Sequence, residues 1–155
     1  QWCYETNLFA TEALAEILDL ELPTIELPDP RESRGRVGLE HLVHKLRSLP
    51  VDDEYVQYQL RTMFRLARHV ARADEIGDAL SRADLDDLQA LFGHRPASWL
   101  EGEAELERFV LADAKEGRHD AALVPLFHKR HLRAQALLGP AGSAMTRHMK
   151  IQTFR

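Results

Sequence analysis

The chain has 155 residues, of which 45% are hydrophobic, 29% charged and 7% aromatic, and its formal net charge is −5. This length and composition are typical of a globular protein and exclude a disordered one. The sequence holds no apolar run of about 18 residues, so we expect no transmembrane helix. Its first residues lack the basic and apolar regions of a signal peptide, and its single cysteine, Cys3, favours a reduced, cytoplasmic compartment.

Charge is distributed unevenly along the chain. Residues 1–60 carry five basic and twelve acidic side chains, whereas residues 118–155 carry seven basic and one acidic. We expect the acidic front and the basic tail to neutralise each other on packing, although the tail would also suit an anionic partner. The overall acidity argues against a nucleic-acid partner. Because the chain lacks an initiator methionine, we expect it to be the terminal part of a longer polypeptide or one subunit of a complex.

The first predicted helix covers residues 7–20, where the apolar residues are spread around more than one side. This excess of apolar side chains suggests a subunit interface in a homo-oligomer. The next segment, residues 21–38, contains Pro23, Pro28 and Pro30 and therefore cannot be helical throughout. We expect it to be an extended connector on the surface, and loops of this length are often functional.

Helical periodicity dominates the rest of the chain. Asp52 is expected to cap the third helix, which covers residues 53–73. Ser98 and Glu101 are expected to form a capping box at the start of a later helix. Gly93 and Gly117 are expected to end helices, and Pro125 either lies early in the last helix or breaks it. Residues 149–154 are expected to form a strand-like tail. The remaining predicted helices cover residues 39–49, 53–73, 74–80, 84–92, 98–115 and 121–138.

These patterns predict an all-α fold, namely an irregular bundle of six or seven helices with a proline-rich connector after the first helix. The chain length predicts a single domain over residues 1–155. No repeat with a period of 20–50 residues is visible, which excludes a solenoid.

The third predicted helix carries an arginine stripe, composed of Arg61, Arg65, Arg68 and Arg72. At 100° per residue these four positions lie within about a 60° arc. Like charges at this spacing repel one another unless an anion faces them. That anion would be an acidic stretch of this chain within residues 74–107, a phosphate-bearing ligand or another protein, since guanidinium binds carboxylate and phosphate through paired hydrogen bonds. An internal partner is the simplest expectation.

Histidines form the other candidate site. His41 and His44 are three residues apart on one predicted helix, and His128 and His131 repeat that spacing on another. Two such pairs would place four imidazoles around a transition metal, with His69 as a possible supplement. The established helical metal motifs are absent, however, because the sequence contains neither HExxH nor paired ExxH motifs. Ordinary surface or hydrogen-bonded histidines are the simpler interpretation.

Three functions remain open from the sequence. The leading hypothesis is a non-catalytic binding or assembly module whose arginine stripe contacts an acidic protein partner. The first alternative is a metal-binding protein or metalloenzyme that uses the paired histidines. The second is a fragment of an enzyme whose active site is completed by other segments, which the absent initiator methionine and the uneven charge suggest. Within the sequence itself, no serine stands in a GxSxG motif and Cys3 has no base beside it.

Overall fold

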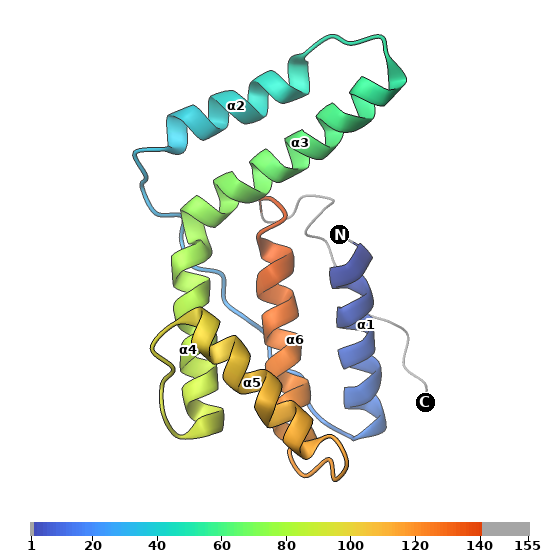
Figure 1. Ribbon diagram of the computed structural model, residues 1–155, viewed down its shortest axis with the longest axis vertical. Helices are drawn as coiled ribbons and strands as arrows, with labels where there is room; N and C mark the ends of the chain where they lie inside the picture. Colours follow the sequence, from blue (N-terminus) through green and yellow to red (C-terminus); the bar gives the residue numbers. More distant parts are fainter. Residues whose placement is uncertain (1, 141–155) are drawn as a thin grey trace. The chain divides into compact units, whose positions relative to one another are not determined.

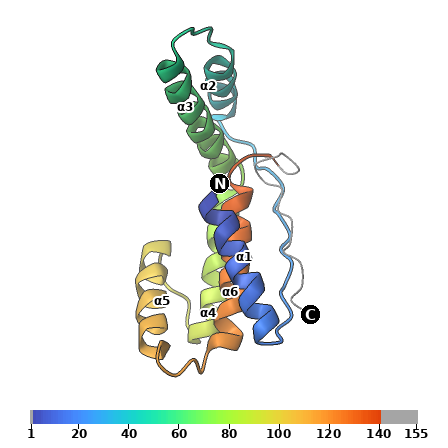
Figure 2. The same cartoon turned by 90° about the vertical axis from the view of Figure 1, so that its right-hand side faces the viewer.

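The computed structural model describes residues 2–140, drawn as a coloured ribbon in Figures 1 and 2. Every regular element in that range is helical and no strand occurs in it, which confirms the all-α class. None of these helices is both long and apolar enough to cross a membrane. The strand-like segment expected at residues 149–154 lies outside the described residues.

The chain divides into two compact units. Among the described residues, unit 1 contains residues 2–27 and Ala79–Gln135, and unit 2 contains Pro28–Asp78 together with the segment that begins at Ala136. The chain leaves unit 1 through the proline-containing connector, where residues 20–33 form neither helix nor strand. The expectation of a single domain is not tested by this division and stays a prediction.

Unit 1 is built from α1 (Trp2–Ile17), α4 (Asp78–Phe92), α5 (Trp99–Asp113) and α6 (Asp120–Ala136). Its apolar core joins α4, α5 and α6, and Phe92 and Phe109 pack beside it with ring centroids 5.5 Å apart. Each fully buried leucine stabilises such a core by about 1.5–3 kcal/mol. The buried leucines at its centre are Leu88, Leu106, Leu123 and Leu126.

Unit 2 contains α2 (Arg36–Ser48), α3 (Glu54–Arg72) and a π-helical turn, η1 (Ala73–Gly77). The helices α2 and α3 run side by side in opposite directions, as Figures 1 and 2 show. The residue that caps α3 is Asp53, whose Oδ1 accepts a hydrogen bond from the Val56 amide at 2.9 Å. The prediction of Asp52 as the cap is therefore wrong by one residue, because the helix begins at Glu54.

A break expected near residues 81–83 does not occur. The segment Ser81-Arg82-Ala83 lies inside α4, since it contains neither proline nor glycine and nothing in it stops a helix. The irregularity comes earlier, at the π-helical turn. Arg31 of the connector binds there, with its backbone amide donating to Glu75 O at 3.0 Å and its Nε donating to Asp74 O at 2.7 Å. Arg31 thus donates to two carbonyls of the π-helical turn, one through its guanidinium and one through its backbone amide.

Several helix ends follow the sequence rules. Gly93 has φ +81° and its amide donates to Gln89 O at 2.9 Å, as expected of a glycine that ends a helix. Ser98 caps α5 by accepting from the Glu101 amide at 3.2 Å, and Glu101 in turn accepts from the Ala97 amide. Pro125 lies inside α6 without breaking it. The first helix begins at Trp2 rather than at Asn7.

The loop between α5 and α6 is closed by a carboxylate that the sequence did not single out. Asp113 accepts hydrogen bonds from the backbone amides of Arg118 at 3.1 Å and His119 at 2.9 Å. The bond from the His119 amide is the main reason why the pKa of Asp113 lies below its usual range, and the His119 ring at 3.2 Å acts in the same direction.

Candidate functional site

The arginine stripe lies on α3, as predicted, but its four members have different surroundings. Arg72 is buried and its Nη1 binds Glu75 Oε2 at 2.8 Å, so this guanidinium is paired within the chain. Arg68 lies over the Phe64 ring, with Cζ 5.6 Å from the ring centroid. Arg61 and Arg65 are exposed. At the C-terminal end of the stripe the arginine is therefore buried in an ion pair, whereas toward the N-terminal end the arginines are exposed to solvent.

No ion pair links Arg61, Arg65 or Arg68 to any residue in the described part of the chain. The carboxylates expected to face them are largely engaged elsewhere, within unit 1. Those with another cationic partner are Asp84 and Asp87 with Arg133, Asp86 with Arg95, and Glu103 with Arg130. Glu105 lies 3.0 Å from Nε2 of His94.

A pocket of about 310 Å³ lies between α2 and α3, at the end where Pro50 separates the two helices. Its walls are mainly aliphatic and aromatic, and two guanidiniums, one from each helix, lie at it. Gln57 is held in place because its Nε2 donates to Val51 O at 2.7 Å. The lining residues are Leu46, Arg47, Leu49, Gln57, Leu60, Arg61 and Phe64.

The hairpin of α2 and α3 buries little of its own apolar surface. No residue of α2 is buried, and in α3 only Ala67 and Arg72 are. Leu49 at the pocket and Leu66 on another side of α3 remain 54% and 62% exposed. An exposed apolar surface beside unpaired cations is typical of a face that binds another molecule. Arg47, Arg61, Arg65 and Arg68, called the arginine surface below, are the cations of this face.

Unit 1 contains a second concentration of charge, in which α6 supplies the cations and α4 and α5 supply the carboxylates. Nη1 of Arg133 lies 2.5 Å from Asp84 Oδ1 and 2.6 Å from Asp87 Oδ2, and Lys129 also pairs with Asp87. Burial raises the pKa of Asp84, and the hydrogen bond from Arg133 opposes that rise. These carboxylates belong to residues 61–117 rather than to the acidic front, so the expected pairing of the front with the basic tail stays a prediction.

The histidines of α6 face the interior of unit 1. His128 is 4% exposed and its Nδ1 lies 3.4 Å from the hydroxyl of Thr11 on α1. Burial lowers the pKa of His131, and the nearby His128 and Arg130 lower it further. Nδ1 of His131 is buried and has no hydrogen-bond partner in the described part of the chain. The environment of His131 therefore favours a neutral imidazole.

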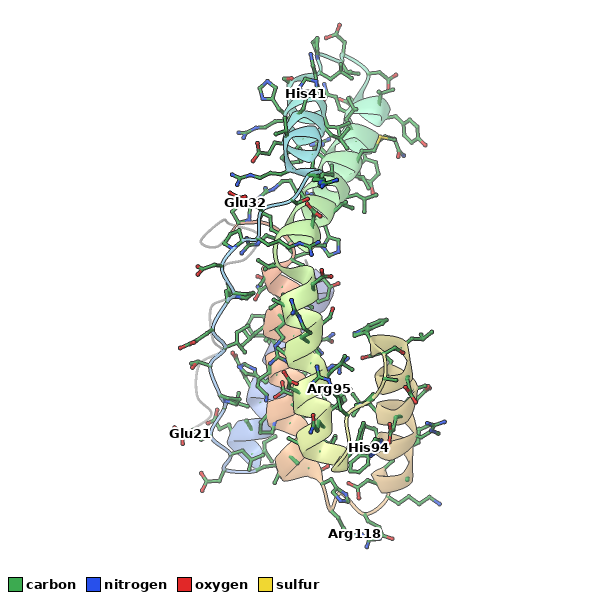
Figure 3. The ribbon with its side chains drawn as sticks, turned by 90° about the vertical axis from the view of Figure 1, so that its left-hand side faces the viewer. Glu21, Glu32, His41, His94, Arg95 and Arg118 are labelled. Carbon is green, nitrogen blue, oxygen red and sulfur yellow. The ribbon has the colours of Figure 1, made fainter. Side chains whose placement is uncertain are left out.

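The other candidate metal ligands lie in unit 2. His41 and His44 are exposed on α2, and Figure 3 shows the His41 side chain projecting away from the helices. Nδ1 of His69 lies 3.1 Å from the backbone carbonyl oxygen of Leu137. Within residues 2–140, no group of three or more His, Cys, Asp or Glu is arranged to hold a metal ion. The four-histidine site stays a prediction, and its two pairs belong to different units.

The residues that complete the arginine surface were not singled out in the sequence. Arg47 and the apolar walls of the pocket lie on both sides of Pro50, and only the antiparallel pairing of α2 with α3 brings them together. One signal was available, because a proline-ended helix followed closely by another indicates a helical hairpin. In a hairpin the last turn of the first helix faces the first turns of the second.

Comparison with protein-family models, characterised proteins and solved structures finds no significant match to this chain.

Proposed function

We propose that this protein is a non-catalytic binding or assembly module, and that its arginine surface contacts an acidic surface of a partner protein. The observation that carries the proposal is that Arg61, Arg65 and Arg68 have no carboxylate partner in the described part of the chain, whereas the candidate acids pair with other cations. The proposal also takes the chain as one irregular bundle of six or seven helices with a proline-rich connector, working as a subunit or terminal domain in the cytoplasm.

Guanidinium groups support this assignment through their chemistry. Each offers five donors in a planar fork and stays charged at any physiological pH, so it binds carboxylates through paired hydrogen bonds. The cation of Arg68 is also oriented by the ring of Phe64. A row of oriented cations without internal partners repels itself, and a facing row of carboxylates removes that repulsion.

Binding to immobilised poly-L-glutamate tests the proposal. We expect the wild-type chain to bind in a salt-sensitive manner, and Arg65→Glu with Arg68→Glu to weaken binding by about 2 kcal/mol, or roughly 30-fold. Circular dichroism should show unchanged helix content, because both side chains lack ion pairs with described residues.

The matched control is Arg108→Glu with Lys115→Glu, which changes net charge equally at two exposed positions around the C-terminal half of α5. The control should retain most of the binding. An equal loss in both variants would mean that net charge alone, and not the arginine surface, explains the binding. Undiminished binding by the Arg65 and Arg68 variant would overturn the proposal.

A further inference from the structure

We infer that the partner presents an acidic amphipathic α-helix, which lies along α2 and α3 and inserts one apolar side chain into the pocket between them. This inference rests on the proposed function and adds the chemistry of the partner. The juxtaposition that carries it is the apolar pocket with Arg47 of α2 and Arg61 of α3 at its walls.

The apolar wall of the site on α3 has helical spacing, because Leu60 and Phe64 are four residues apart. Side chains at this spacing form a ridge against which another helix packs. The opposite wall is formed by Leu46 in the last turn of α2 and by Leu49, the residue that follows the helix. Two antiparallel helices with almost no buried residue of their own lack a core, and a third amphipathic helix would supply one.

Backbone chemistry also favours a helix over an extended peptide. An extended segment needs partners for its backbone N–H and C=O groups, and the helices α2 and α3 have already satisfied theirs internally. A helix satisfies its own backbone groups and can lie against an apolar surface at no such cost.

The cations set the spacing of the acidic residues on the partner. Arg61 and Arg65 are one helical turn apart, a separation of roughly 6 Å along the surface. Carboxylates four residues apart on a facing helix match that separation, with the apolar anchor on the same side. The predicted occupant therefore carries a leucine-like anchor between two glutamates or aspartates.

A synthetic 21-residue helical peptide with a leucine stripe flanked by glutamates at i and i+4 is the probe. We expect saturable binding by fluorescence anisotropy, and at least a tenfold loss when two central residues are replaced by proline or when the glutamates are replaced by lysine. Leu49→Glu, which places a carboxylate beside Arg47 and Arg61, should also lower affinity at least tenfold. The matched control Leu66→Glu, on a similarly exposed leucine that does not line the pocket, should bind normally.

Three results would overturn the inference. In the first, the helical peptide and the proline-containing peptide bind equally well and both depend on the arginines. This result would leave the proposed function intact but would show that the partner segment need not be helical. The second is arginine-dependent binding of decanoate without binding of the peptide, which would make the pocket a site for a small amphiphilic acid. The third is no binding of the helical peptide at all; if poly-L-glutamate also fails to bind, the proposed function falls with it.

Discussion

Replacing Arg133 by leucine tests how the buried ion pairs of unit 1 contribute to stability. The side chains of Arg133, Asp84 and Asp87 are only 11%, 15% and 17% exposed, so solvent screens their interactions weakly. Removing one partner of a buried pair costs about 3–5 kcal/mol. We expect the lower end, about 3 kcal/mol at pH 7, because Lys129 still neutralises Asp87 in the variant.

The same substitution predicts a distinctive pH dependence. Burial raises the pKa of Asp84, so the folded state holds this proton more tightly than the unfolded chain does. The contribution of Asp84 to the free energy of unfolding is therefore greatest below the ordinary carboxyl pKa of the unfolded chain. It is lost as the pH rises through the higher pKa of Asp84 in the folded state. Without Arg133 the pKa of Asp84 rises further, so acidification should shrink the difference between variant and wild type.

Urea unfolding followed by tryptophan fluorescence is the appropriate assay, because both tryptophans, Trp2 and Trp99, belong to unit 1. The double variant Asp84→Leu with Arg133→Leu removes the pair together and should recover stability to within about 1 kcal/mol of wild type. The reasoning would be refuted by a cost below about 1 kcal/mol for Arg133→Leu at pH 7, or by a cost that does not fall toward pH 5.

Two further predictions concern packing and the histidines. A Cβ at Gly102 of α5 would lie 2.7 Å from Cδ1 of the fully buried Leu88, so Gly102→Ala should lower the free energy of unfolding by about 1 kcal/mol, despite the better helix propensity of alanine. Gly38→Ala on α2 is its control, since nothing lies within 4 Å of that Cβ, and it should stabilise its helix. For the predicted metal site, elemental analysis of untagged protein after reconstitution should find about one equivalent of a transition metal if the paired histidines bind it. A content below roughly a tenth of an equivalent would reject the site, composed of His41, His44, His128 and His131.

Local sequence rules predicted much of the fold. The all-α class follows from periodicity, and the capping box at Ser98, the glycine at Gly93 and the stop at Pro50 mark real helix ends. These features depend on neighbouring residues, so a single sequence is enough to find them. The failures depend on distant residues. The π-helical turn is held by Arg31, which is more than forty positions away in the chain, and no local pattern indicates that contact.

The candidate site was predicted only in part for a similar reason. Helical periodicity alone aligned the arginines of α3, and that alignment is confirmed by the helix that contains them. The expectation of an internal acidic partner holds for Arg72, which pairs with Glu75 three residues further along the chain, and not for Arg61. The acids that were expected to face the other arginines pair with cations of unit 1 instead, and those tertiary contacts are not visible in the sequence. Arg47 and the pocket required the antiparallel pairing of two helices, which is a property of the fold.

The two charged regions of the chain differ in how their charges are compensated, and this difference links stability to function. In unit 1, Arg130 and Arg133 of α6 each have a carboxylate on another helix, so these cations stabilise the unit and offer little to a partner. In unit 2, Arg61 and Arg65 have no such partner among the described residues, and the helix that carries them has an apolar pocket beside it. A cation already paired in a buried site gives up stabilisation when it leaves that partner, whereas an unpaired surface cation gives up only its hydration. Binding of an anion should therefore occur on α3 rather than on α6, although α6 lies in the more basic half of the chain.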